Sequence, residues 1–350
     1  MKYNIYFWLA AFTLLTFSCT KEIDLEHLRP ESRLVLNSLI TAGDSVKVRL
    51  TRTWFYTEIS PDVTVRNADI KLYVNGVFKE KMVWKAYEKA TNSYNDIFDD
   101  NVKIKGYYIS SYRPVKGDSI KITVEANGFE GISAETHLPV HTYLKDFKAK
   151  ESEREDNGFT YKSTDFEVTI KDDPDKKDFY LIDFEQGYPE SVFVDENMHE
   201  MEYTGKYLWM GYSPDYSTEP LFTSHLSALD KILGYDWISG EYGRAFSDDL
   251  INGKEYTIKL KSDNYSYMTS PNPDSAPPLY YRVNLYTITE EYYRYIKAII
   301  EIKDGGGLDS HLSDVGLAEP VRIFSNVKGG VGILGSAVRD SVTVSISPLF

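Results

Sequence analysis

Cysteine is almost absent from this sequence, which contains one in 350 residues. A chain with one thiol can form no internal disulfide, and it cannot build a zinc site from several cysteines. Basic residues are also in deficit, since 39 Lys and Arg stand against 53 Asp and Glu and give a net charge of −14. Nucleic acids and anionic lipid headgroups are bound by basic patches, so this balance argues against both as partners.

The sequence also lacks the short motifs of several enzyme classes. It contains no G-x-S-x-G, no H-E-x-x-H and no P-loop, which are the signatures of common hydrolase, metalloprotease and nucleotide sites. We therefore expect a protein that is not an enzyme and that uses no cofactor. A glycan-active enzyme with an unrecognised pair of carboxylates stays open, because such pairs meet only in three dimensions.

One glycine run resembles a nucleotide-binding motif. Gly330, Gly332 and Gly335 match G-x-G-x-x-G, but that fingerprint needs a helix opening at the glycines and an acidic residue about 20 positions further on. Here a strand pattern follows, and the chain ends 15 residues after Gly335. We expect these glycines to serve a tight bend or bulge between two strands.

Metal ligands are scattered along the chain. His137 and His141 are four residues apart, but the Leu-Pro-Val between them excludes a helix and no third ligand is near. Two clusters, one at residues 96–101 and one at residues 172–178, are rich in Asp without the spacing of a calcium loop. Solvated turns are the better interpretation, so no metal site is predicted, although calcium binding stays open.

The single cysteine closes an apolar N-terminal run. Lys2 precedes the apolar residues 6–17, and Ser18 stands before Cys19, which is the layout of a bacterial lipoprotein signal peptide at residues 1–18. We expect Cys19 to be lipidated and to anchor the protein in the outer membrane. The alternative is an ordinary secretory signal with an incidental Cys.

Residues 19–30 form a predicted tether. Its Lys21, Glu22, Asp24 and Glu26 resemble the export signal that sends lipoproteins of Bacteroidetes to the cell surface. A solvated tether of mixed charge is the alternative, so the side of the membrane that the protein faces stays open.

The rest of the chain reads as mainly β, because 28 Tyr and 17 Phe accompany many β-branched residues. Residues 31–142 alternate apolar and polar side chains, with Asn-Gly turns at Asn75 and Asn127, and predict an Ig-like or transthyretin-like β-sandwich. The strands are expected within 33–40, 46–51, 70–78, 106–112, 120–126 and 132–138.

Residues 143–350 are predicted to form a larger β-rich C-terminal domain, after a charged stretch at 145–156. A short helix is expected at 224–233, and a second begins near Thr289. We expect its apolar stripe to pack in the core rather than to form a cofactor site; the stripe consists of Tyr292, Tyr295, Ile296, Ile299 and Ile300. The strands are expected at 166–170, 179–184, 256–260, 281–286, 321–324 and 342–346.

Aromatic residues provide the one functional indication. Five of them fall within 14 residues, interleaved with Gly, Ser and Pro, and they form a candidate binding surface: Tyr203, Tyr207, Trp209, Tyr212 and Tyr216. Exposed aromatic rings can stack on a ligand or anchor a protein interface. The alternative for each individual ring is that it fills the core of a tyrosine-rich β protein.

Four segments carry a resemblance to a known family: residues 19–24 (CTKEID), 34–41 (LVLNSLIT), 246–256 (FSDDLINGKEY) and 319–335 (EPVRIFSNVKGGVGILG). The chain resembles an uncharacterised lipoprotein family of Bacteroidetes, classed as a domain of unknown function and often encoded beside TonB-dependent outer-membrane receptors. The resemblance implies a non-enzymatic accessory or ligand-binding partner of such a receptor in nutrient uptake, with the ligand unknown. An envelope scaffold is a further alternative, and no catalytic residue can be transferred.

Overall fold

The computed structural model describes residues 29–55, 57–59, 61–87, 104–141, 143–156, 159–193, 201–223, 244–263, 277–303 and 322–346. Cys19, most of the tether, the helix expected at 224–233 and the acidic cluster at 96–101 lie outside the described residues.

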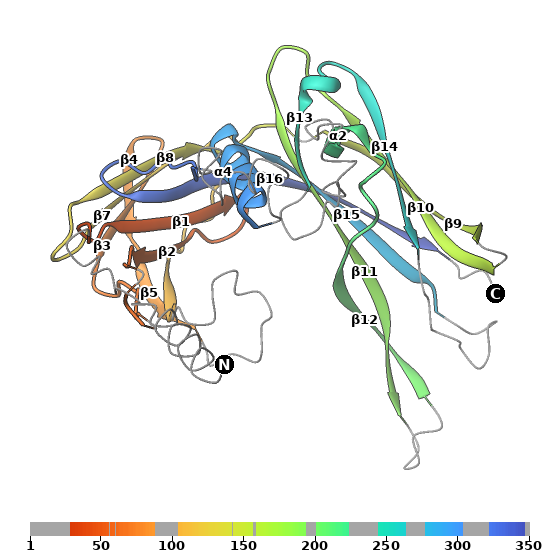
Figure 1. Cartoon of the computed structure of the whole chain (residues 1–350), viewed down its shortest axis with the longest axis horizontal. Helices are drawn as coiled ribbons and strands as arrows, with labels where there is room; N and C mark the ends of the chain where they lie inside the picture. Colours follow the sequence, from red (N-terminus) through yellow and green to blue (C-terminus); the bar gives the residue numbers. More distant parts are fainter. Residues whose placement is uncertain are drawn as a thin grey trace, which may run out of the picture.

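The described chain is mainly β, as the sequence predicts, and its strands form three sheets (Figure 1). The large sheet has nine strands in the order β12-β11-β15-β16-β1-β2-β6-β5, with β13 paired to β11. The smaller sheets have the orders β4-β3-β7-β8 and β14-β10-β9.

The elements have the following bounds: β1 Leu34–Thr41, β2 Lys47–Arg52, β3 Asp69–Val74, β4 Val77–Lys81, β5 Val83–Ala86, β6 Gly106–Ile109, β7 Ser119–Glu125, β8 Ile132–His137, β9 Leu144–Asp156, β10 Phe159–Lys171, β11 Phe179–Phe193, β12 Met201–Tyr212, α2 Pro220–Thr223, β13 Ala245–Ser247, η2 Asp248–Leu250, β14 Glu255–Asp263, β15 Leu279–Ile288, α4 Glu290–Lys303 and β16 Val331–Ile346.

The N-terminal half forms a two-sheet sandwich. Alternation in the sequence places Val46, Val48 and Leu50 in a core that also holds residues of β3, β7 and β8. The predicted Asn-Gly turn joins β3 to β4, with positive φ at both Asn75 (52°) and Gly76 (79°). Such a turn matches the twist of a hairpin and fixes the register of the two strands.

The last strand joins the two halves of the molecule. β16 runs for 16 residues; residues 331–337 pair with β1 in parallel, and residues 337–346 pair with β15 in antiparallel fashion. Leu334 and Val338 enter the N-terminal core, while Val342 and Val344 pack against the C-terminal core. A strand from the predicted C-terminal domain therefore completes the N-terminal sandwich.

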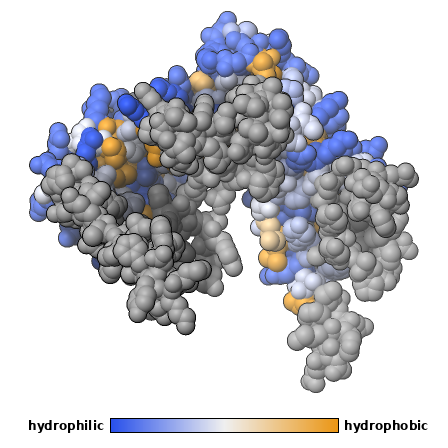
Figure 2. All heavy atoms as spheres, in the orientation of Figure 1, coloured by the Kyte–Doolittle hydropathy of each residue, from blue (hydrophilic) through white to orange (hydrophobic). Residues whose placement is uncertain are grey.

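In the C-terminal half, the three-stranded sheet covers an aromatic core that includes Phe166, Phe184 and Tyr281. The charged stretch at 145–156 lies in β9, the edge strand of that sheet. β11 and β12 form a long hairpin that extends away from the rest of the molecule (Figure 1). Val192, Leu208 and Met210 are 48%, 54% and 59% exposed, and hydrophobic atoms are visible on this hairpin (Figure 2).

The predicted helix after Thr289 is confirmed as α4, which lies against β16 (Figure 1). Leu334 and Val342 of β16 face the two cores that the smaller sheets cover. Gly335 points the other way and meets Tyr292 of α4, so α4 lies on the opposite face of the large sheet, which we call the helix side. A Cβ at Gly335 would lie 2.7 Å from Cβ of Tyr292. The absence of a side chain there lets the helix approach the sheet closely.

The strand predicted at 321–324 is wrong over its described residues, because residues 322–327 adopt no regular secondary structure. Instead, the side chain of Asn326 acts as a strand partner. Its amide donates to the carbonyl of Leu334 (2.9 Å), and its carbonyl oxygen accepts from the Leu334 N–H (2.9 Å). One Asn side chain thus satisfies both backbone groups of a buried strand residue.

Gly332 and Gly335 lie in the first part of β16, Gly330 directly precedes that strand, and no helix opens at these glycines. Gly332 has a φ of 114°. A Cβ there would overlap the carbonyl oxygen of Leu36 and lie 2.8 Å from its carbonyl carbon. The glycine therefore allows the close parallel pairing of β16 with β1.

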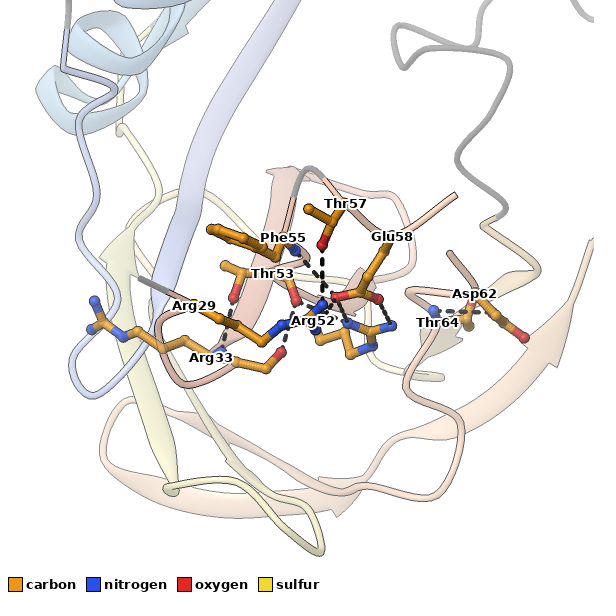
Figure 3. A network of polar contacts seen from close by, with 10 residues as sticks. Arg29, Arg33, Arg52, Thr53, Phe55, Thr57, Glu58, Asp62 and Thr64 are labelled. Atoms are coloured by element: carbon orange, nitrogen blue, oxygen red, sulfur yellow. Dashed lines mark hydrogen bonds and ion pairs between the residues drawn. The ribbon is translucent and has the colours of Figure 1, made fainter. Parts of the chain in front are cut away.

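A polar network holds the first described residues against the sandwich (Figure 3). The Glu58 carboxylate accepts hydrogen bonds from Arg52 (2.7 Å), Arg29 (3.3 Å) and the Phe55 N–H (3.1 Å). The hydrogen bonds from Arg52 and Phe55, with the charges of both arginines, lower the pKa of Glu58 to about 2. Arg29 also lies 5.4 Å from the ring centroid of Phe55, so the end of the predicted tether is fixed in place.

Candidate functional site

A groove of about 570 Å³ lies on the helix side of the large sheet, between α4 and the strands β1, β2 and β6. Its volume is within the range of about 300–1,000 Å³ typical of small-molecule sites. Its described lining comes from distant parts of the chain: residues 37–39 of β1, Lys47 and Arg49 of β2, Tyr87, Tyr107 of β6, Tyr292, Tyr295 and Ile299 of α4, and Ile333 of β16.

The cations of the groove come from β2. Because side chains alternate along a strand, Val48 enters the core while Lys47 and Arg49 face the groove. Residues two apart on a strand are separated by about 7 Å. The Lys47 ammonium lies 5.6 Å from the ring centroid of Tyr107, and Arg49 Nη2 donates to the Tyr87 hydroxyl (3.4 Å).

The aromatic walls come in two pairs. Tyr87 and Tyr107 have ring centroids 5.3 Å apart and an interplanar angle of 47°. Tyr292 and Tyr295, three residues apart on α4, are 6.4 Å apart at 21°. Burial raises the pKa of the Tyr295 phenol, and the charge of Arg49 opposes that rise. This phenol therefore stays protonated at neutral pH and can donate a hydrogen bond.

The groove carries positive charge within an acidic protein. None of the described residues that line it is Asp or Glu, whereas the chain as a whole has a net charge of −14. Lys47 has no ion pair among the described residues. The groove can therefore attract an anion and stack against a ring, but its described lining offers no pair of carboxyl groups for glycoside hydrolysis.

The structure separates the five rings of the predicted aromatic surface: four lie on β12, and Tyr216 lies beyond the end of that strand. Tyr207 and Trp209 lie on the helix side, where they pair with Pro189 and Gly187 of β11. Tyr203 is 40% exposed near the far end of the hairpin. Tyr212 packs against the C-terminal core, and Tyr216 is 2% exposed within it. The two rings in or against this core cannot form one continuous binding surface with the other three.

The rings on the helix side of β12 are engaged by neighbouring strands. The Arg282 guanidinium lies 3.7 Å from the centroid of the Trp209 ring and is hydrogen-bonded to Glu185 (3.1 Å). Tyr207 donates to the Pro278 carbonyl (3.0 Å) and meets Tyr280 edge to face at 4.7 Å. These contacts hold the two rings in fixed positions.

The described residues contain no group of three or more His, Cys, Asp and Glu placed to hold a metal ion. In the acidic cluster at 172–178, Asp172 accepts from the Tyr180 hydroxyl and from the Gly253 N–H (2.9 Å). Burial raises the pKa of Asp178 in the same cluster. Asp172 is 3% exposed, so the prediction of a solvated turn is wrong for this residue, whereas Asp175 is exposed in a turn as predicted.

Sequence reasoning missed the groove. The outward positions of Lys47 and Arg49 follow from strand alternation, but nothing in the sequence connects them to Tyr107 or to α4. The stripe on α4 was predicted to be core. Ile296 is indeed 1% exposed, whereas Tyr292 and Tyr295 line the groove. The available signal was limited to two features: a helical stripe that contains Tyr292 and Tyr295, and a distant strand that carries Lys47 and Arg49.

No helix within the described ranges is long and apolar enough to cross a membrane. No curated protein matches this chain. The model of one family, Domain of unknown function (DUF4249), matches residues 20–343. That match covers most of the chain, and the protein therefore belongs to the DUF4249 family.

Proposed function

We propose that this protein is a non-enzymatic, lipid-anchored protein of the outer membrane that binds a small ligand and assists a TonB-dependent receptor in nutrient uptake. The observation that carries the proposal is the groove beside α4. It combines four tyrosines with Lys47 and Arg49, a combination suited to binding rather than to acid–base chemistry.

The lipid anchor is proposed at Cys19, with the protein on the cell surface. Arg29 stands ten positions after Cys19, and ten extended residues span at most about 35 Å. Because Arg29 is bonded to Glu58 and Thr57, the anchor would hold the N-terminal sandwich within that distance of the membrane. A partner in the same membrane would then be within reach.

The anchor can be tested by the mass and location of the mature protein. We expect the full chain to be recovered with the outer membrane, with an intact mass that begins at Cys19 and includes acyl chains. The Cys19→Ser variant should lose the acyl mass and leave the membrane fraction. An unacylated wild-type chain would contradict the anchor.

The partner and the ligand can be tested together by affinity capture of the tagged full chain from detergent-solubilised outer membranes. A TonB-dependent receptor should co-purify. Denaturation of the complex should release a small molecule, which mass spectrometry should detect. Capture of the chain with neither receptor nor small molecule, from cells grown on several nutrient sources, would refute the proposal.

A further inference from the structure

We infer that the groove beside α4 binds a ring-bearing organic anion, meaning a molecule with a flat ring or ring face and a carboxylate or sulfate group. This inference rests on the proposal that the groove is the ligand site, and it adds the chemistry of the ligand. A sugar acid and an aromatic acid share this chemistry, and the experiment below separates them.

The anionic group is indicated by the two cations. Lys47 and Arg49 project from the same face of β2 into a groove whose described lining holds no carboxylate. Arg49 is oriented by its hydrogen bond to the Tyr87 hydroxyl (3.4 Å), and a guanidinium so oriented is suited to a planar carboxylate or sulfate. Lys47 has no ion pair among the described residues, so an anionic ligand would neutralise its charge and a cationic ligand would be repelled.

The ring is indicated by the arrangement of the tyrosines. Tyr87 and Tyr107 stand on the sheet side of the groove, beside the two cations, and Tyr292 and Tyr295 stand on α4 across from them. Tyr292 and Tyr295 both line the groove, with their ring planes nearly parallel at 21°, and aromatic rings at a ligand site can stack on a ring of the ligand. Phenol hydroxyls add donors and acceptors around the ring, which suits a ligand with polar substituents.

The helix fixes the two sides of the groove relative to each other. Tyr292 packs directly on Gly335 of β16, and β16 pairs with β1 beside the groove floor. Both walls therefore belong to one continuous packed unit, and the site is largely formed before a ligand arrives. A preformed site loses little free energy to ordering on binding.

The inference can be tested by calorimetric titration of the full mature chain, purified in detergent, with five probes. These are D-glucuronate, 4-hydroxybenzoate, their neutral counterparts D-glucose and 4-hydroxybenzyl alcohol, and inorganic sulfate. At least one of the two acids should bind at least about tenfold more tightly than its neutral counterpart and than sulfate, because charge-assisted hydrogen bonds contribute about that factor. The acid that binds identifies the class of ring.

Groove variants provide the second part of the test. Lys47→Gln, Arg49→Gln and Tyr87→Ala should each weaken binding of the acid by about tenfold, and Arg49→Lys should retain part of it. Matched controls are Lys121→Gln, an exposed cation on the four-stranded sheet, and Phe78→Ala on β4 of the same sheet, a residue that is 51% exposed against 44% for Tyr87. Both controls should bind like wild type. Far-UV circular dichroism shows that each variant is folded.

Three results would overturn the inference: neither acid binds, a neutral counterpart binds as tightly as its acid, or the controls weaken binding as much as the groove variants. The proposed function can survive these results. If the receptor co-purifies with a small molecule that is neutral or has no ring, the ligand chemistry is wrong and the binding role stands. If nothing co-purifies and no probe binds, both fall.

Discussion

Gly332→Ala offers the sharpest test of how the two halves are joined. Gly332 pairs with Leu36 in the parallel ladder between β16 and β1. Its φ of 114° is a conformation that side chains disfavour. A new Cβ would overlap the Leu36 carbonyl oxygen and lie 2.9 Å from the Leu36 nitrogen. These are backbone atoms, so no side chain can rotate to make room.

Two effects determine how much Gly332→Ala lowers the free energy of unfolding. The strained backbone costs about 1–3 kcal/mol, and overpacking at a rigid contact costs about 1–3 kcal/mol. We therefore expect the free energy of unfolding to fall by about 2–6 kcal/mol. A nucleotide-binding role for the glycine run would instead predict loss of ligand binding with little change in stability.

The assay is urea denaturation followed by tryptophan fluorescence and far-UV circular dichroism. Gly211→Ala is the matched control, because Gly211 also lies in a strand, β12, and a Cβ there meets nothing within 4 Å. We expect the control to change stability by less than about 0.5 kcal/mol. If Gly332→Ala is no less stable than Gly211→Ala, the account of the close parallel pairing is wrong.

Three further predictions concern the core and the tether. Leu334→Ala removes a side chain that is 0% exposed in the N-terminal core. The free energy of unfolding, measured by urea denaturation, should fall by about 3–5 kcal/mol. A fall of less than about 1 kcal/mol would show that β16 does not support that core. The Tyr216 hydroxyl is buried without a hydrogen-bond partner within the part of the chain described. Tyr216→Phe should therefore leave the free energy of unfolding unchanged or raise it by about 1 kcal/mol. Tyr180→Phe loses the hydrogen bond to Asp172 and should lower the free energy of unfolding by about 1–3 kcal/mol. Because the pKa of Glu58 falls from 4.5 to about 2 on folding, its ionised form stabilises the fold above pH 4.5, and this contribution is lost as the pH falls towards 2. The urea midpoint of wild type should therefore exceed that of Glu58→Gln at pH 7 and converge with it near pH 2; a difference that is constant with pH would contradict this role.

Local patterns gave the secondary structure because each depends on neighbours in the chain. Alternation around Val48 predicted a strand with one buried face, and Asn75-Gly76 predicted the tight turn between β3 and β4. The helical stripe after Thr289 predicted α4. The prediction of a strand at 321–324 failed because a short apolar run does not show whether a backbone partner is available. Here the Asn326 side chain, rather than a strand, bonds the backbone of Leu334.

Tyrosine-rich segments were the least predictable part. A tyrosine suits a core, a strand face or a ligand site equally well, since its ring is apolar and its hydroxyl is polar. The sequence could not say that Tyr216 is buried while Tyr203 is exposed. Only packing against the three-stranded sheet separates the two.

The sequence by itself determined the mainly β class, the approximate positions of most strands, and the helix α4. The tertiary structure alone decided that β16 lies between β1 and β15, because pairing between distant strands leaves no local signal in either one. That pairing carries α4 to the side of β2 and so brings Arg49 to Tyr295. The groove exists because residues nearly 250 positions apart are neighbours in one sheet and its helix.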